Sequence, residues 1–334
     1  MNDMNERRTA PAISRIRLAA AALVAALAVP ALAQPVACSG KAPAGELRAE
    51  RIAAVEPTRS EGLYEGPVWI EGALYFSDFG NGPAFPSRIR KLAADGSVRT
   101  VVEDSGSNGL AVDAGGNLVT ANHKQKAVTR LALDGAAAAK GNGGGKSGDK
   151  GAVLAGRYQG QVFNSPNDIA IAADGTLYFT DPDFQKAAAP GGQPVTGVYR
   201  VGTDGRVTLV DGSRRNPNGI ALSPSGDVLY VNAGDGLLRA HPVAGGVPGA
   251  GHDIVRGLEV PDGMAVDCHG NVYVTEHTAR RVRVFSPQGK ELATIRVDAN
   301  VTNAAFGGAD GKTLYLTGAG ALWQVRLDVT GSPY

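Results

Sequence analysis

Asn218-Gly-Ile-Ala-Leu-Ser223, followed after a short turn by Leu229-Tyr-Val-Asn-Ala233, is one of six related pairs of segments in this 334-residue chain. In each pair a Glu, Asn or Asp leads into a short apolar segment, and a segment rich in aromatic and β-branched residues follows. Segments of this kind, separated by turn residues, are typical of β-strands. The six leading residues are Glu65, Asn108, Asn167, Asn218, Asp262 and Asn303. The chain is therefore an internal repeat of strand pairs.

The spacing of the repeat indicates the fold. The leading residues are 43, 59, 51, 44 and 41 residues apart, and each of the two long intervals contains an insertion. One insertion, residues 136–152, has the Gly- and Lys-rich composition of a flexible surface loop. Without the insertions the period is about 42 residues, which lies in the range of propeller blades. Four short strands per repeat, with no amphipathic helix between them, predict an all-β, six-bladed β-propeller.

A propeller needs a device that closes its ring. Residues 47–55 precede the first repeat and have the pattern of one extra strand. We expect this strand to join the last blade, at residues 314–327, because closure removes exposed sheet edges. The predicted organisation is an N-terminal linker over residues 34–45 and a propeller domain over residues 46–330.

The first 33 residues have the pattern of a secretory signal peptide. Four arginines come before an apolar run at residues 18–29, and Ala31-Leu32-Ala33 fits a cleavage site. The apolar run is too short to cross a bilayer, so no membrane span is expected. The sequence therefore predicts an exported protein, either periplasmic or secreted. Beyond this segment the net charge is −1 and no basic block occurs, so nucleic acid is not an expected partner.

The chain has two cysteines, Cys38 and Cys268, and their spacing does not suggest a metal site. They could form a disulfide in an oxidising compartment or remain free, and a buried free thiol is the favoured interpretation for Cys268. Cys38 closely follows the signal peptide and could carry a lipid anchor. Pro35, however, stands where such sites usually have Leu.

The propeller geometry predicts where the polar residues meet. The first strand of each blade lines the central channel, so the leading residues gather near one mouth of that channel. The second strands return toward the same mouth and end in oxygen donors and two histidines. These residues are Asp78, Asn122, His123, Asp181, Asp183, Glu276 and His277. We expect substrate contacts from Asn108, Asn122, His123, Asp181 and His277.

Turn chemistry is the competing interpretation of the leading residues. Asn-Gly and Asp-Gly are common turn dipeptides, because Asn, Asp and Gly tolerate left-handed backbone conformations. For Asn108 and Asn303 this interpretation stays open. Glu65 is a poor turn residue, and together with Asp262 it would place carboxylates in a confined channel. No Lys or Arg stands at the equivalent positions, so a bound cation is the simplest compensation.

Carboxylate and amide oxygens suit one hard divalent cation. Ca²⁺ is the expected ion, with Mg²⁺ and Mn²⁺ as alternatives. Zn²⁺ is a further alternative, although zinc sites usually contain the His or Cys ligands that the ring lacks.

Four motifs resemble the regucalcin/gluconolactonase family of calcium-dependent propeller lactonases. They are Glu65-Gly-Pro-Val-Trp69, Asn164-Ser-Pro-Asn-Asp168, Asn216-Pro-Asn-Gly-Ile220 and Pro261-Asp-Gly-Met264. The resemblance extends over roughly residues 65–327. It implies a metal held by Glu65, Asn218 and Asp262, with Asn167 as a further ligand or a substrate contact. It also implies that Asp262 is the general base.

The expected function is an exported metal-dependent hydrolase that opens a sugar lactone. In this interpretation the metal polarises the carbonyl, and Asp262 accepts the proton of the attacking water. One alternative is a hydrolase acting on another lactone, an ester or a phosphotriester. The other is a non-enzymatic binding module that contains a structural calcium ion.

Overall fold

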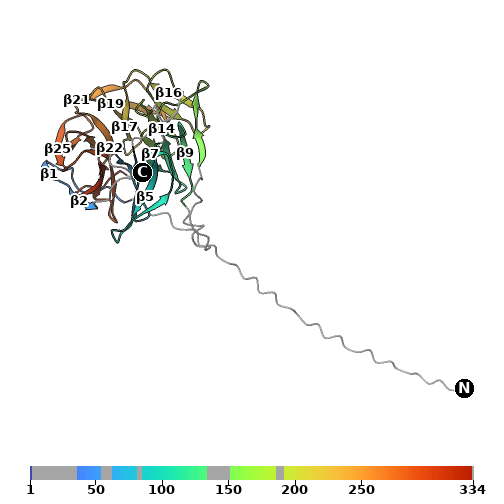
Figure 1. The fold of residues 1–334 in the computed structure, drawn as a ribbon, viewed down its shortest axis with the longest axis horizontal. Coiled ribbons are helices and arrows are strands. Elements are labelled where there is room, and N and C mark those ends of the chain that lie inside the picture. The colour runs from blue at the N-terminus through green and yellow to red at the C-terminus, as the bar shows by residue number, and fades with distance from the viewer. Residues whose placement is uncertain (2–35, 54–61, 81–84, 134–150, 186–191, 333–334) are drawn as a thin grey trace. The chain divides into compact units, whose positions relative to one another are not determined.

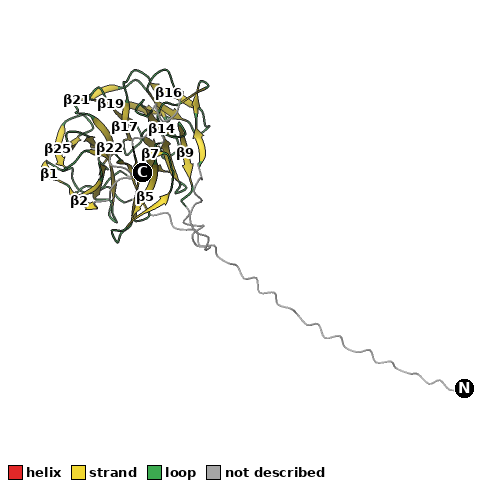
Figure 2. Ribbon diagram, viewed as in Figure 1, coloured by secondary structure: helices red, strands yellow, loops and turns green. Residues whose placement is uncertain are grey.

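The structure is a computed structural model, and it describes residues 1, 36–53, 62–80, 85–133, 151–185 and 192–332. The chain divides into Met1–Gln34 and Pro35–Tyr334, and every described strand belongs to the second unit. Strands and loops make up this unit, and no helix occurs among the described residues (Figure 2). The predicted signal peptide lies outside the described residues, as does the 136–152 insertion except for its last two positions.

No helix with the length and hydropathy of a membrane span is present in the described part of the chain.

Six small antiparallel sheets form the blades of a β-propeller, and the fold prediction is confirmed. Each blade has four main strands, ordered from the channel outward. The first three blades contain β3 (Leu63–Ile70), β4 (Ala73–Phe79), β5 (Ser87–Leu92) and β6 (Val98–Val102); β7 (Ser107–Val112), β8 (Leu118–Asn122), β9 (Ala127–Leu131) and β10 (Ala152–Ala155); and β13 (Ile169–Ile171), β14 (Leu177–Asp181), β15 (Gly197–Val201) and β16 (Val207–Asp211).

The remaining three blades have the same order. They contain β17 (Pro217–Leu222), β18 (Val228–Ala233), β19 (Leu237–Ala244) and β21 (His252–Arg256); β22 (Pro261–Val266), β23 (Val272–Glu276), β24 (Arg281–Phe285) and β25 (Glu291–Arg296); and β26 (Val301–Gly307), β27 (Thr313–Gly318), β28 (Ala321–Arg326) and β2 (Glu50–Ala53). Two short hairpin pieces decorate the blades: β20 (Val247–Pro248) pairs with β19, and β11 (Arg157–Tyr158) pairs with β12 (Gln161–Val162).

The hydrophobic core lies between the blades. The first strands contact one another in cyclic order, and β7, β17 and β22 surround a common centre in Figure 1. Six separate apolar clusters form, one at each junction between neighbouring blades. At the junction of the second and third blades, for example, Val119 and Val128 pack against Phe179 and Tyr199. Each blade therefore buries both of its faces, and the channel is left for polar groups.

The ring closes through the segment before the first repeat, as predicted, but this segment forms two strands rather than one. β2 pairs antiparallel with β28 and completes the sixth blade. β1 (Gly45–Arg48) instead pairs parallel with β25, the outer strand of the fifth blade. The buried Ala49 separates them, and its amide donates to the Arg296 carbonyl at 3.0 Å. The chain thus crosses from the fifth blade to the sixth.

A disulfide joins Cys38 to Cys268, so the prediction of a buried free thiol at Cys268 is wrong. Cys268 is only partly buried, because it lies in the turn between β22 and β23. The bond also leaves no free thiol at Cys38 for a lipid anchor, and that prediction is not supported. Next to the disulfide, the amides of Thr330 and Ser39 donate to the Ser39 carbonyl and to Thr330 Oγ1, both at 3.1 Å. The two ends of the propeller unit are therefore fastened together.

Candidate active site

The leading residues stand at irregularities of the first strands. In five of the six blades the pairing of the first strand with the second shifts register next to the leading residue. The shifts lie at Glu65/Val68, Ser107/Leu110, Pro217/Ile220, Pro261/Met264 and Val301/Asn303. Bulges of this kind redirect side chains and are common beside active sites. They explain how a residue at the start of a strand can turn toward the channel axis.

The glycines after the leading residues are explained by close packing. Gly66, Gly109 and Gly219 each lie against the backbone of the next blade, where a Cβ would be 2.3–2.4 Å from a carbonyl oxygen. Of these three, only Gly66 has a positive φ, at 52°. The glycines are therefore required by the contact between blades, and Asn108 and Asn218 lie in strands. Turn chemistry does not explain these Asn-Gly pairs.

Three carboxylates meet at the centre of the ring: Glu65 on β3, Asp168 before β13 and Asp262 on β22. Burial, and then the nearby Asp262 and Asp168 charges, raises the pKa of Glu65 well above its ordinary value. Burial raises the pKa of Asp168 to about 7. Burial, together with the Asp168 charge, raises the pKa of Asp262 to about 8. Three like charges in so confined a space are costly unless protons neutralise them or a bound cation compensates them.

Amide groups complete the cluster. Asn218 and Glu65 both hydrogen-bond to Asp262, and Asn303 bonds to Glu65 and lies 3.5 Å from Asp168 Oδ2 through its Nδ2. The Oδ1 atom of Asn218 is buried and accepts no hydrogen bond in the described structure. A buried acceptor without a donor beside three carboxylates is the donor set that a hard cation prefers. The residues present therefore fit the divalent metal that the sequence predicts.

Asp168 was not in the predicted site, and Asn303 was predicted only to gather at the channel with the other leading residues, with its role left open. Asp168 accepts from the Ile169 amide at 3.0 Å and from the Ile220 amide at 3.4 Å, so it connects the third and fourth blades. The sequence contained a signal for Asp168: four of the six leading residues are followed by Gly, whereas Asn167 is followed by an Asp. Asn167 itself is buried, and its carbonyl accepts from the Gly109 amide at 2.7 Å.

Asn122 and Asp181, predicted to contact substrate, make contacts that hold loops. The Asn122 amide donates to the Ser105 carbonyl and accepts from the Gln125 amide. The Asp181 carboxylate accepts from the amides of Asn164 and Ser165, at 2.8 and 2.7 Å. Asp181 therefore fixes the loop that leads to Asn167 and Asp168. In the same way, Asn122 supports the segment at Ser105, which leads into the strand that carries Asn108.

The two predicted histidines differ in their surroundings. His277 lies beside the cluster, with its Nδ1 3.6 Å from Asp262 Oδ2 and 3.0 Å from the Val301 carbonyl. His123 is buried against Phe85, at 4.7 Å between ring centroids, and neither ring nitrogen has a hydrogen-bond partner in the described structure. Burial and the charge of Lys126 lower the pKa of His123 to about 3. The Asn108 Oδ1 atom in the same blade is also buried without a partner.

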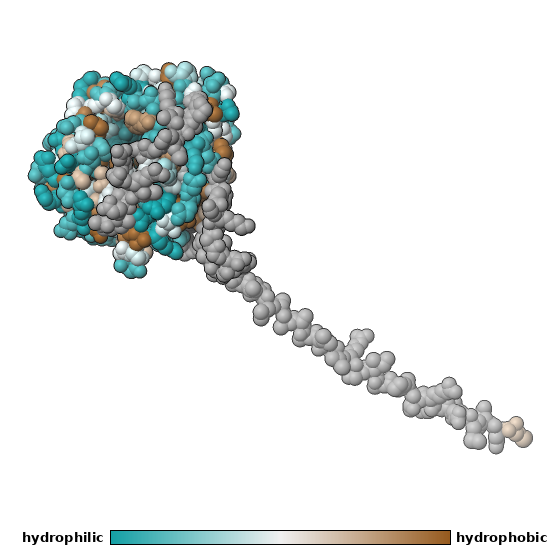
Figure 3. Space-filling view, in the orientation of Figure 1, coloured by the Kyte–Doolittle hydropathy of each residue, from teal (hydrophilic) through white to brown (hydrophobic). Residues whose placement is uncertain are grey.

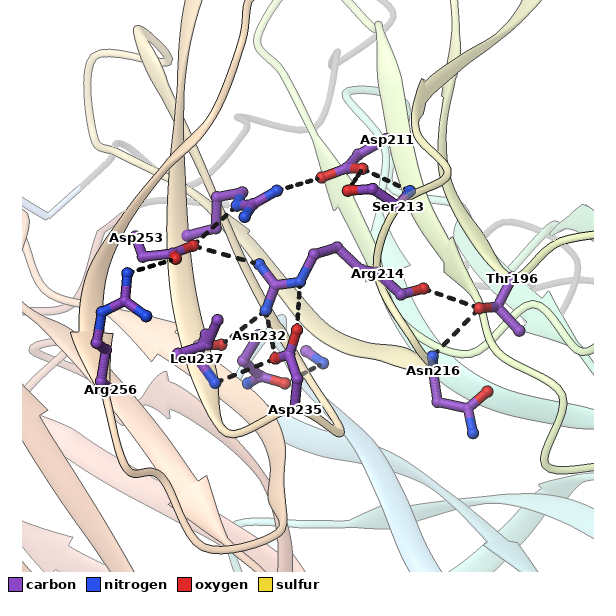
Figure 4. A network of polar contacts seen from close by, with 12 residues as sticks. Thr196, Asp211, Ser213, Arg214, Asn216, Asn232, Asp235, Leu237, Asp253 and Arg256 are labelled. Atoms are coloured by element: carbon purple, nitrogen blue, oxygen red, sulfur yellow. Dashed lines mark hydrogen bonds and ion pairs between the residues drawn. The ribbon is translucent and has the colours of Figure 1, made fainter.

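An ion-pair network supports the strand that carries Asn218 (Figure 4). Arg214 is buried and makes a bidentate pair with Asp235, at 2.8 and 2.5 Å. Its carbonyl accepts from Thr196 Oγ1, which in turn accepts from the Asn216 amide. Planar bidentate pairs of this kind fix geometry as well as charge. The loop into β17 is therefore held on both sides before it reaches Asn218.

A cavity of about 580 Å³ lies on the other side of the cluster. Asp168 and Asn303 reach it, and apolar residues of the first strands line it as far as the turn at Asp174 and Gly175. His123 and His277 do not line it. The cluster thus separates this cavity from the end of the channel where the two histidines lie.

A six-bladed propeller with an anionic, oxygen-rich centre defines the class of this protein. Residues 63–320 match the family model described as the SMP-30/gluconolactonase/LRE-like region, and the chain belongs to this family. It is 28% identical over 306 residues to a gluconolactonase of Zymomonas mobilis, covering 80% of this chain and 79% of that protein. It is 27% identical over 271 residues to a pentonolactonase of Haloferax volcanii, covering 77% and 82%.

A solved structure gives the same result. The gluconolactonase of Xanthomonas campestris superposes with a TM-score of 0.70 at 27% identity, covering 88% of this chain and 99% of that one. The relatives support a lactone hydrolase, as the sequence motifs predict.

Proposed function

We propose that this protein is a metal-dependent lactonase that opens a sugar lactone to the hydroxy acid. The observation that carries the proposal is the buried cluster of Glu65, Asp168 and Asp262 beside the unpartnered Oδ1 of Asn218. Burying an anionic cluster of this kind costs folding free energy, and a purely structural role does not explain why the protein keeps it. Relatives with lactonase names support the substrate class.

The metal would be held by Glu65, Asn218 and Asp262, with Asn167 next to them, and Ca²⁺ is the proposed ion. Bound there, it would offset the carboxylate charge and stabilise the negative charge that develops on the lactone carbonyl oxygen. From the cavity side, Asn303 would hold Glu65 through its hydrogen bond, and Asp168 would add a negative charge next to the metal.

In the proposed reaction Asp262 is the general base. A water molecule attacks the lactone carbonyl carbon, and the Asp262 carboxylate takes its proton. The bond from the carbonyl carbon to the ring oxygen then breaks, and the proton passes to that oxygen. The Asp262 carboxylate is partly buried, and its hydrogen bonds with Asn218 and Glu65 orient it. His277 and Asn108 are proposed to contact the hydroxyl groups of the substrate.

Acid release from a panel of hexono- and pentonolactones tests this proposal. We expect turnover with Ca²⁺ above the spontaneous rate, and loss of turnover in EDTA that added Ca²⁺ restores. Asp262→Asn should lower kcat by about a thousandfold, because it removes the base while keeping the shape of the side chain. Asp328→Asn is the control, since that carboxylate is exposed. Absence of turnover on every lactone, or near-normal turnover by Asp262→Asn, would reject the proposal.

We also propose that the protein is exported. The Cys38–Cys268 disulfide supports this, because structural disulfides persist mainly in oxidising compartments. Mass spectrometry of the protein recovered from its native compartment should show a mature chain that begins at Gln34. An intact N-terminus in a cytoplasmic fraction would contradict export.

A further inference from the structure

Three blades place a left-handed residue two positions before the leading residue. These residues are Gly106 (φ 67°), Asn216 (φ 51°) and Val260 (φ 49°). In each case the carbonyl of this residue accepts a hydrogen bond from the amide that follows the second strand. The donors are His123 at 2.9 Å, Gly234 at 3.2 Å and His277 at 3.0 Å. The left-handed residue is therefore a repeated backbone feature that guides the chain into the first strand.

Gly106 and Asn216 are suited to this position. A Cβ on Gly106 would lie 2.6 Å from Asn122 Oδ1, so a side chain does not fit there. Asn is one of the few residue types that tolerate a left-handed backbone, and Asn216 Oδ1 also accepts from the Asp183 amide at 3.1 Å. Val260 is the exception. A β-branched residue with positive φ is an outlier, because its Cβ substituents crowd the backbone.

Packing does not account for valine at this position. The Val260 residue is 54% exposed, whereas buried valines elsewhere in the propeller contribute to the clusters between blades. The backbone hydrogen bond to His277 uses only the carbonyl, so Asn or Gly would serve it equally well. The repeated hydrogen bond explains the left-handed backbone but not the choice of valine, and strained residues are concentrated at functional sites.

Val260 lies next to the proposed chemistry. It precedes Asp262 by two residues, and its carbonyl binds the amide of His277, whose ring is 3.6 Å from the Asp262 carboxylate. We propose that the exposed Val260 side chain contacts the C–H surface of the bound lactone and is a specificity-determining residue. This inference rests on the proposed lactonase function. It adds an apolar contact between Val260 and a part of the lactone away from the carbonyl that reacts.

Steady-state kinetics on glucono-1,5-lactone with Ca²⁺, together with thermal unfolding, test the inference. Val260→Asn should raise the KM about tenfold and leave kcat within about twofold, because it removes an apolar contact that does not change during the reaction. The same variant should raise the Tm by about 2 °C, because Asn relieves the left-handed strain. Val260→Ile should keep the KM and Tm of the wild type.

Glu71→Asn is the matched control. Glu71 is exposed and left-handed (φ 47°), and it lies in the turn between β3 and β4, at the other end of the first strand from Glu65. This variant should raise the Tm without changing the KM. A Val260→Asn enzyme with the wild-type KM overturns the inference and leaves the lactonase proposal standing. A wild-type protein without lactonase activity overturns both.

Discussion

Asp168 is the residue whose inferred role changes most when the structure is added to the sequence. In the sequence it follows a predicted metal ligand, and in the structure its carboxylate stands 3.5 Å from Asn303 and contributes to the raised pKa values of Glu65 and Asp262. Its own hydrogen bonds from the Ile169 and Ile220 amides lower its pKa, but the effect of burial is larger. Asp168 is therefore a source of negative charge that supports cation binding from behind the ligands.

Replacing Asp168 with Asn should weaken calcium binding by about tenfold, because it removes one buried charge next to the ligands. In EDTA at pH 8 the variant should have a higher Tm than the wild type, since two carboxylates repel less than three. Calcium titration followed by thermal unfolding measures both effects. Asp204→Asn, in an exposed turn, is the control, and an Asp168→Asn protein that matches the wild type in both measurements would contradict this role.

At the scale of the strand, the site depends on how closely the first strands approach one another. A Cβ on Gly263 of β22 would lie 1.9 Å from Cγ of Asn303 on β26. The absence of a side chain at position 263 therefore leaves room for the amide that contacts Glu65 and Asp168. The motif Pro261-Asp262-Gly263 therefore supplies both the proposed metal ligand Asp262 and, at Gly263, the space that the Asn303 side chain occupies.

Gly263→Ala should displace the Asn303 side chain and lower kcat/KM by about a hundredfold, because small displacements of groups that position an active site have large kinetic effects. The loss of stability should be small, since the displaced atoms belong to a side chain rather than to the backbone. Kinetics and urea unfolding of the same preparation separate the two effects. Gly249→Ala should change neither, because its Cβ would meet its nearest atom at 3.5 Å. Full activity of Gly263→Ala would show that Asn303 is dispensable.

At the scale of the whole propeller, strand pairing and a disulfide close the ring. β2 completes the sixth blade, β1 extends the fifth, and the disulfide joins residues separated by 230 positions. A covalent link across so long a loop restricts the unfolded chain strongly.

Removing both cysteines, as Cys38→Ala with Cys268→Ala, should lower the free energy of unfolding by about 2–4 kcal/mol. Urea unfolding in the absence of reductant measures the loss. Dithiothreitol should destabilise the wild type by a similar amount and leave the double variant unchanged. Equal unfolding midpoints for the reduced and oxidised wild type would refute the prediction.

The carboxylate cluster should make the stability of the metal-free protein depend on pH. In the folded state the pKa of Asp168 is raised to about 7 and that of Asp262 to about 8. At pH values between the ordinary pKa of an aspartate and these raised values, the folded state therefore binds more protons than the unfolded state. The stabilising contribution of these two groups is then fully present below their pKa values in the unfolded state. It is lost as the pH rises through their pKa values in the folded state.

In EDTA the Tm should therefore fall from pH 5 to pH 8. Because Ca²⁺ binds the ionised cluster of the folded state, its stabilising effect should be larger at pH 8 than at pH 5. Thermal unfolding at several pH values, with EDTA or with Ca²⁺, measures both trends. A Tm in EDTA that rises over this range would contradict the assignment of the cluster.

The sequence by itself determined the propeller and most of the central ring. The period of about 42 residues and the alternation of strands and turns are local properties, and each blade repeats them. Glu65 and Asp262 stood out because they replace Asn in a repeated phrase. Local patterns of this kind can be read from the sequence because each blade repeats the same two strands after a Glu, Asn or Asp.

The tertiary structure alone decided the properties that depend on distance between blades. Asp168, which is not a leading residue, joined the cluster because the blades share one axis and bring its charge near Glu65, and the hydrogen bond from Asn303 to Glu65 depends on the approach of the sixth blade to the first. The single strand predicted at residues 47–55 became two because its partners belong to different blades. The pairing of Cys38 with Cys268 likewise followed from ring closure. Long-range proximity results from packing six blades around one axis, and a one-dimensional pattern does not contain it.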